Sequence, residues 1–168
     1  MKKFLLVVTL CALLGSFAMS QSQNHATNGD PSAAMMKEFT RTTKADGLVL
    51  NFALLNNKTV DFLFQGTSKS AVLAKTDGAT VFYIWGISEK DTTLDTQFEV
   101  EQDGKTYAGE TVNLKNLQAG PLAKGTRISG LIQLNQKINV AQPFTIKGAN
   151  HSSAEFKLSQ SAIKQLEK

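Results

Sequence analysis

The chain has 168 residues and a formal net charge of +4, with 18 Lys and Arg residues against 14 Asp and Glu residues. After residue 3 no two cations are adjacent, which argues against nucleic acid as a partner. The single cysteine is Cys11. If the first 20 residues are an export signal, the rest of the chain has no disulfide, no thiol nucleophile and no thiolate metal site, and its hydrophobic core must hold the fold together.

The N-terminus has the three regions of a secretory signal peptide. Two lysines precede an apolar run over residues 4–14, and small residues follow up to position 20. The run is shorter than the roughly 20 residues needed to span a bilayer. We therefore expect residues 1–20 to be removed, the mature chain to have no transmembrane segment, and the protein to be secreted or periplasmic. A lipoprotein anchored at Cys11 is disfavoured, because Leu10 stands where lipidation signals generally have a small residue.

Residues 21–45 are expected to form a leader ahead of the folded domain. Positions 21–32 read QSQNHATNGDPS, which is too polar to bury much surface. Asp30 and Pro31 have the residue types of an N-cap and a first helical position, so a short helix through Phe39 is predicted. The folded domain is then expected over residues 46–168.

From residue 48 onward the hydrophobic pattern has a period of two, as in half-buried strands. Asn56 and Asn57 lie between two alternating segments, which predicts a hairpin, and a further strand is expected over residues 71–74. The alternating positions are Leu48, Leu50, Phe52, Leu54, Val60, Phe62 and Phe64.

The second half of the chain continues this pattern. Residues 81–87 are apolar at both odd and even positions, which is typical of a central strand covered on both faces. A hairpin with an Asp103–Gly104 turn, a loop over residues 113–125 and a C-terminal helix capped by Ser159 are also predicted. Further strands are expected around residues 128–134, 144–146 and 156–158. Eight or nine short strands without alternating helices predict an all-β antiparallel sandwich or barrel and argue against an open α/β nucleotide fold.

Three segments carry a resemblance to a known group of domains: residues 83–86, the FEVEQDGKTY hairpin at 98–107, and LQAGPLAKGTRISGLIQL at 117–134. They resemble the immunoglobulin-like (telokin-like) extracellular domains of bacterial secreted proteins and lipoproteins. The resemblance covers about a third of the chain. It implies an immunoglobulin-like antiparallel β-sandwich, here with a short C-terminal helix, and an accessory or binding role without catalytic residues.

The candidate ligand-binding residues are aromatic. Tyr83, Trp85 and Tyr107 could form a platform for sugars or peptides, because Tyr and Trp combine a large apolar surface with a polar group. The alternative is that Trp85 packs in the core, since it lies within the expected central strand.

The candidate metal ligands are Asp91 and Asp95, which flank two threonines in an expected loop. An ordinary polar turn is the alternative reading. Glu99, Glu101 and Asp103 fall on one face of a strand, where a solvated surface is the commoner arrangement. No motif predicts a cofactor.

These observations give three hypotheses of function. The first is a non-catalytic module that presents loops or a sheet edge to an envelope or extracellular protein. The second is a carrier for a small apolar ligand, held between sheets or in a barrel, with Phe52, Phe62, Phe64, Phe82 and Phe144 lining the cavity. The third, a hydrolase, is disfavoured because His25 lies in the leader and His151 in a turn, so neither histidine is expected in a cleft.

Overall fold

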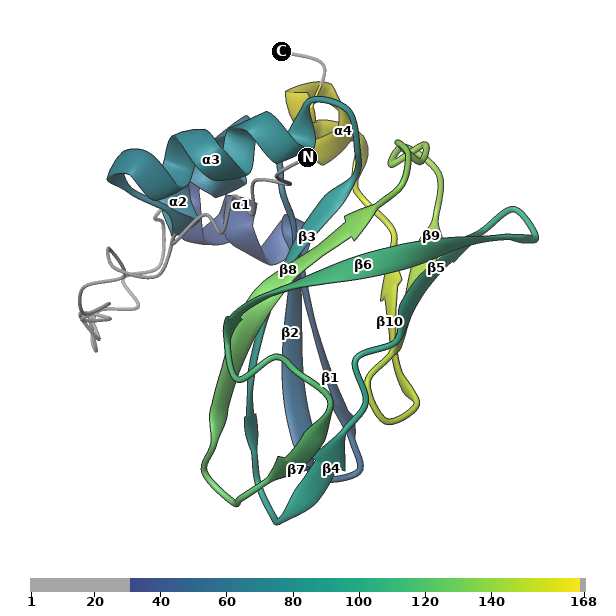
Figure 1. The fold of residues 1–168 in the computed structure, drawn as a ribbon. Coiled ribbons are helices and arrows are strands. Elements are labelled where there is room, and N and C mark those ends of the chain that lie inside the picture. The colour runs from purple at the N-terminus through teal and green to yellow at the C-terminus, as the bar shows by residue number, and fades with distance from the viewer. Residues whose placement is uncertain (1–30, 167–168) are drawn as a thin grey trace, which may run out of the picture.

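The computed structural model describes residues 31–166, so the predicted signal and the Asp30 cap lie outside the described residues. This part of the chain forms one large antiparallel sheet, a two-stranded sheet and four short helices (Figure 1). The strands are β1 (Thr40–Ala45), β2 (Leu48–Leu54), β3 (Val81–Ser88), β4 (Thr92–Leu94), β5 (Phe98–Gln102), β6 (Lys105–Lys115), β7 (Gly120–Leu122), β8 (Arg127–Leu134), β9 (Phe144–Gly148) and β10 (Ser152–Phe156). The helices are α1 (Pro31–Phe39), α2 (Asn57–Leu63), α3 (Gly66–Thr76) and α4 (Gln160–Leu166).

The large sheet is nearly closed into a barrel, so the predicted immunoglobulin-like sandwich is wrong. Its eight strands run in the order β1-β2-β3-β8-β6-β5-β9-β10, and the two outermost strands come together side by side (Figure 1). Alternating hydrophobicity indicates which side chains face inward, but it is the same for two stacked sheets and for one sheet that curls onto itself. The choice between them depends on which strands meet at the edges, and the pattern does not encode that.

The side chain of Arg41 bridges the seam between β1 and β10, which no backbone ladder joins in the described chain. Its Nε donates to the carbonyl of Glu155 (3.1 Å) and its Nη2 to the carbonyl of Lys157 (3.2 Å). Its Nη1 donates to carbonyls at the end of α1, including Glu38 (2.9 Å), and the guanidinium lies 5.1 Å from the centre of the Phe156 ring. The guanidinium of Arg41 therefore links β1 to β10, which are not joined by backbone pairing in the described chain.

Helices α2 and α3 occupy the region where the sequence predicted the second arm of a hairpin and a further strand. Helix α2 forms here because Asn56 caps its N-terminus. The Asn56 side-chain oxygen accepts from the backbone N–H groups of Lys58 (2.9 Å) and Thr59 (3.1 Å). In return, the Thr59 hydroxyl accepts from the Asn56 N–H (2.9 Å). This reciprocal capping box starts a helix instead of a hairpin turn. Val60 and Phe64, which also fit a period of two, are buried on one face of the helical segment.

Two hydrophobic clusters lie on the two sides of the barrel wall. The inner cluster fills the barrel, and β4 and β7 add Leu94 and Leu122 to it at the end away from the helices (Figure 1). The outer cluster joins α2 and α3 to the outward side chains of β2, β3 and β8. Strand β3 is buried on both faces over Val81–Ile84, as predicted, because helices cover its outer side there.

Several local predictions are confirmed. The β5–β6 hairpin turns at Asp103 and Gly104, both with positive φ (49° and 73°). Helix α1 begins at Pro31, and α4 follows Ser159, whose hydroxyl accepts from the Ala162 N–H (3.2 Å).

The segment expected as a loop at 113–125 instead contains the end of β6 and all of β7, and β1 lies within the expected leader. None of the helices within residues 31–166 combines the length and the apolar character required to cross a membrane.

Candidate functional site

The barrel interior is solid. The rings of Phe82, Phe144 and Phe156 form a three-way contact with centroids 4.9 to 5.8 Å apart, and Phe52 meets Phe98 edge-on at 6.2 Å. These five side chains are between 0 and 4% exposed, so no water-sized space adjoins them over any appreciable area. Eight strands enclose a space that side chains can fill completely, and here they do. A ligand is therefore to be sought at the ends or on the outside of the barrel.

The five phenylalanines predicted to line a cavity are thus divided among three environments. Phe52, Phe82 and Phe144 are packed in the filled interior. Phe64 belongs to the outer cluster beneath the helices, and Phe62 on α2 is 53% exposed. The period of two had placed them on one side of a hairpin, but the helical segment turns Phe62 away from Phe64.

A pocket of about 300 Å³ lies at the helix-covered end of the barrel. We call it the mouth pocket. Three corners of the chain converge there, from β2 to α2, from α3 to β3, and from β8 to β9, and the end of α4 completes the wall. Its lining residues are Leu54, Leu55, Asn56, Asn57, Thr76, Asp77, Ala79, Thr80, Lys137, Ile138, Val140 and Leu166.

The mouth pocket has an apolar floor and a polar rim. Leu54 and Ile138 on the floor belong to the inner core, and Val140 packs against it. The floor is held in place because the Thr80 hydroxyl accepts from the backbone N–H of Ile138 (3.0 Å). The rim carries the charged side chains of Asp77 and Lys137. This arrangement suits a ligand with an apolar body and a polar end.

A second depression, of about 410 Å³, lies on the outer side of β5, β9 and β10. Glu101, Asp103 and Glu155 line it, and Glu101 forms an ion pair with Lys147. No group of three or more His, Cys, Asp or Glu side chains within residues 31–166 is placed to hold a metal ion. This depression is a surface groove with acidic walls.

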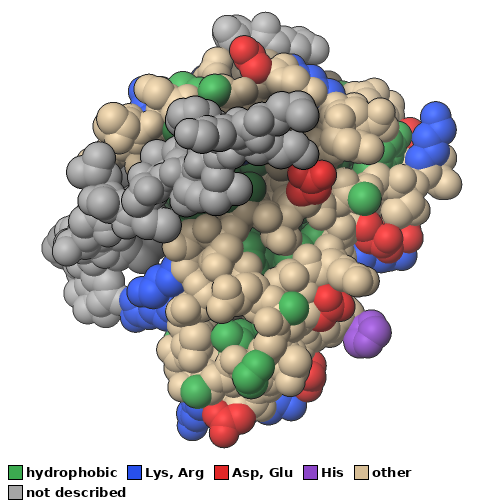
Figure 2. Space-filling view, in the orientation of Figure 1, with side chains coloured by type: hydrophobic (Ala, Val, Ile, Leu, Met, Phe, Trp, Pro, Cys, Tyr) green, Lys and Arg blue, Asp and Glu red, His purple; other side chains and the backbone are tan. Residues whose placement is uncertain are grey.

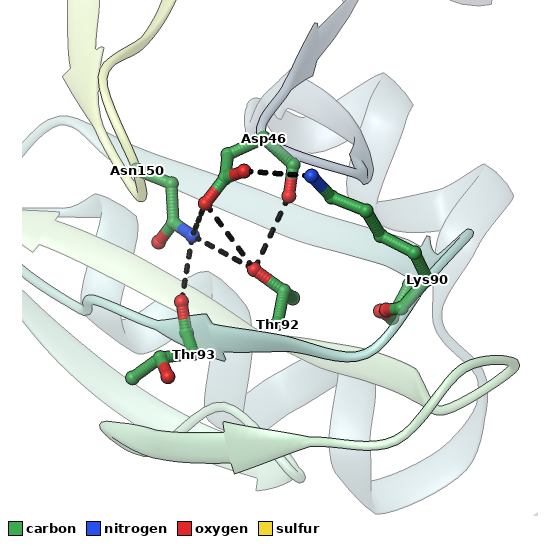
Figure 3. Close-up of polar contacts among 6 residues, drawn as sticks. Asp46, Lys90, Thr92, Thr93 and Asn150 are labelled. Atoms are coloured by element: carbon green, nitrogen blue, oxygen red, sulfur yellow. Dashed lines mark hydrogen bonds and ion pairs between the residues drawn. The ribbon is translucent and has the colours of Figure 1, made fainter.

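At the other end of the barrel, a polar cluster joins three segments that are distant in the sequence (Figure 3). The Lys90 ammonium lies 3.0 Å from the Asp46 carboxylate, and the Thr92 hydroxyl donates to the Asp46 carbonyl (3.2 Å). The Asn150 amide donates to the Thr93 carbonyl (2.6 Å). Asp46 comes from the β1–β2 turn and Asn150 from the β9–β10 turn, so the cluster fastens β4 across the end of the barrel. We call it the β4 latch.

The electrostatics of the β4 latch are simple. The hydrogen bond from Lys90 and its charge hold the pKa of Asp46 below the ordinary value of 3.8. Asn150 has positive φ (59°), as do its neighbours Ala149 and His151. The latch therefore depends on a tight left-handed turn and an exposed ion pair, and its groups already bond to one another. This is a structural role.

The two aspartates predicted as metal ligands lie near the β4 latch but do not converge. The Asp91 carboxylate accepts from the backbone N–H of Lys124 (2.8 Å), and the Asp95 carboxylate accepts from that of Gln97 (2.9 Å). The Asp95 carboxylate thus stabilises a local turn, whereas the Asp91 carboxylate links the β3–β4 connection to the β7–β8 connection. His151 is exposed in the β9–β10 turn and lines neither pocket.

Of the three predicted aromatic ligand-binding residues, two lie together. Tyr83 and Trp85 both point outward from β3, with rings stacked at 5.2 Å and an interplanar angle of 21°. Burial raises the pKa of the Tyr83 phenol, and Ser129 has a smaller, opposite effect on it. Tyr107 is opposite Val100 in the β5–β6 pairing and packs against the inner core, on the other side of the wall.

Among the described residues visible in Figure 2, charged side chains of both signs are interspersed and form no extended basic surface. Comparisons with protein families, with curated proteins and with solved structures found no match for this chain. The resemblance to immunoglobulin-like domains gains no support from them. The function is therefore to be argued from the geometry of the sites.

Proposed function

We propose that this protein binds and carries a small apolar ligand with a polar end, and that the ligand occupies the mouth pocket. The observation that supports this most is the pocket itself, where Leu54, Ile138 and Val140 give an apolar floor at the surface. A volume of about 300 Å³ is at the lower end of the range for small-molecule sites.

Two features favour the pocket over the barrel centre. The centre would have to lose packed aromatic rings to admit a ligand, at a cost of several kcal/mol per displaced ring. The mouth pocket requires no such rearrangement. Its rim also provides polar partners for one end of a ligand, namely the charged groups of Asp77 and Lys137.

An envelope or extracellular protein as partner remains a prediction of the sequence. A free sheet edge, which that hypothesis invoked, is not favoured by the position of β1 beside β10 or by the bonds of Arg41 across the seam. The predicted export signal would place a carrier outside the cytoplasm.

Native mass spectrometry of the purified full chain with decanoate, laurate and decanol tests the proposal. We expect one molecule to bind per chain. Val140→Trp should fill the pocket and weaken binding about tenfold or more, since a blocked pocket loses most of its contacts with the ligand. Leu158→Trp is the matched control, because Leu158 is also half-buried against the inner core but does not line the pocket.

The outcome that contradicts the proposal is equally concrete. If none of the three probes binds at millimolar concentration, or if Val140→Trp binds them as well as Leu158→Trp does, the mouth pocket is not a ligand site. Circular dichroism of both variants checks that each is folded.

A further inference from the structure

The outer side of the barrel wall is only partly covered. Helices α2 and α3 pack over Ala53, Tyr83 and Leu131, but no helix within residues 31–166 joins the outer cluster further along the same strands. Ile87 and Leu114, two of the three large hydrophobic side chains most exposed in the described chain, are 37% and 45% exposed. They belong to β3 and β6 of this wall.

One row of side chains crosses this uncovered area. Thr42 is paired with Asn51, Asn51 with Trp85, and Trp85 with Ser129, so the four project from adjacent strands in register. The Thr42 hydroxyl lies 2.7 Å from the Asn51 side-chain oxygen, to which it donates. We call the row the Trp85 platform; its members are Thr42, Asn51, Trp85 and Ser129.

The Trp85 platform is held in position before any ligand arrives. Trp85 stacks on Tyr83, and Tyr83 in turn meets the Phe64 ring edge-on at 5.2 Å beneath the helices. A rigid aromatic ring at the surface, with hydroxyl and amide groups beside it, binds with little loss of conformational entropy.

Two cations border the platform. Arg127 is paired in register with Ile87, next to Trp85, and Lys115 is paired with Ser129. Both are exposed, and neither forms an ion pair within residues 31–166, whereas Lys44 on β1 is bound to Glu89 at 3.0 Å. The side of the platform towards β8 and β6 therefore has positive charge that no carboxylate of the described chain neutralises.

We propose that the Trp85 platform binds an acidic oligosaccharide. A sugar ring has an apolar C–H face that can stack on an indole and a rim of hydroxyl groups that can bond to Thr42, Asn51 and Ser129. A carboxylate on the sugar would meet Arg127 or Lys115. A membrane surface is a poorer match, because the polar row crosses the middle of the apolar area and the indole is only partly exposed.

Trp85 is the only tryptophan of the chain, so its fluorescence reports on the platform directly. We expect oligogalacturonate, oligomannuronate or a fragment of peptidoglycan glycan to change Trp85 emission saturably. Neutral cello-oligosaccharide of similar length should bind more weakly, and binding to the acidic sugar should weaken with salt.

Calorimetry on variants tests the residues. Trp85→Ala should weaken binding about tenfold or more, as expected for an aromatic anchor. Arg127→Gln should weaken it roughly threefold and reduce the salt dependence. Lys105→Gln in the β5–β6 hairpin is the matched control, because it removes an exposed cation away from the platform, and it should leave binding unchanged.

Three results would overturn the proposal. The first is that none of the three acidic glycans binds at millimolar concentration. The second is that folded Trp85→Ala binds the acidic glycan as tightly as the parent protein does. The third is that Trp85 emission responds to vesicles of phosphatidylglycerol and not to glycans, which would assign the platform to a membrane surface.

Discussion

The two sides of β3 differ sharply, although the residues alternate along a single strand. Phe82 and Ile84 point inward and are completely buried among other core side chains. Tyr83 and Trp85 point outward, where helices cover the first and leave the second partly exposed. The inner side chains of β3 thus belong to the filled core, whereas the outer side leaves Trp85 partly accessible to solvent. The difference arises from the limited reach of α2 and α3, since both sides are apolar.

The largest expected effect tests this division directly. Phe82→Ala removes a ring that contacts Phe144 and Phe156, and it should lower the free energy of unfolding by about 3 to 5 kcal/mol. Trp85→Ala on the same strand should cost much less, because its ring keeps contact with water. Urea unfolding followed by circular dichroism measures both. Equal losses would mean that the two sides of β3 contribute alike.

A smaller loss is expected at the seam. Arg41→Ala leaves the carbonyls of Glu155 and Lys157 without their donor and uncovers the Phe156 ring. The free energy of unfolding should fall by about 2 kcal/mol. Hydrogen exchange should increase most in β1 and β10. Arg41→Lys is the control for charge, since an ammonium group cannot reach the same set of carbonyls; full recovery by Lys would show that charge alone closes the seam.

Much of the strand pattern was predictable, and the reason for each failure is specific. Asp103–Gly104 and the alternation around it define the β5–β6 hairpin because turn and strand signals agree. The positions of Val60 and Phe64 led to a wrong strand prediction, because a spacing of four residues fits a strand and a helix equally well. The Asn56–Thr59 capping box was the readable signal for the helix. Closure of the barrel could not be predicted from the local sequence pattern, because it depends on contacts between segments more than 100 residues apart.

The candidate sites were predictable only where they depend on one strand. Tyr83 and Trp85 share a face because they are two residues apart, as the sequence indicated. Tyr107 lies on the opposite side of the wall because the register of β6 against β5 decides its direction. The mouth pocket was missed altogether. It is formed by three corners and α4, and no local motif connects these segments.

The smallest expected effect concerns the β4 latch. Because the pKa of Asp46 is lowered in the folded state, its contribution to stability is present above about pH 4 and is lost as the pH falls through the folded value. Asp46→Asn should therefore lower the Tm slightly at pH 7, and the difference from the parent protein should shrink as the pH is lowered below about 4. Lys90→Gln removes the other member of the same ion pair and should reproduce the pH-dependent loss of Asp46→Asn. A constant difference at all pH values would contradict the ion pair.

The seam between β1 and β10 also governs the order in which the fold can be completed. Arg41 reaches carbonyls 114 and 116 residues further along the chain, so the barrel cannot close until its last strand is available. Until then β1 has only β2 beside it, and the apolar interior has no final wall. Topologies with such distant pairings fold slowly. During synthesis from the N-terminus the barrel therefore stays incomplete, with apolar side chains exposed, until β10 is available, and assistance from a chaperone would matter most in that interval.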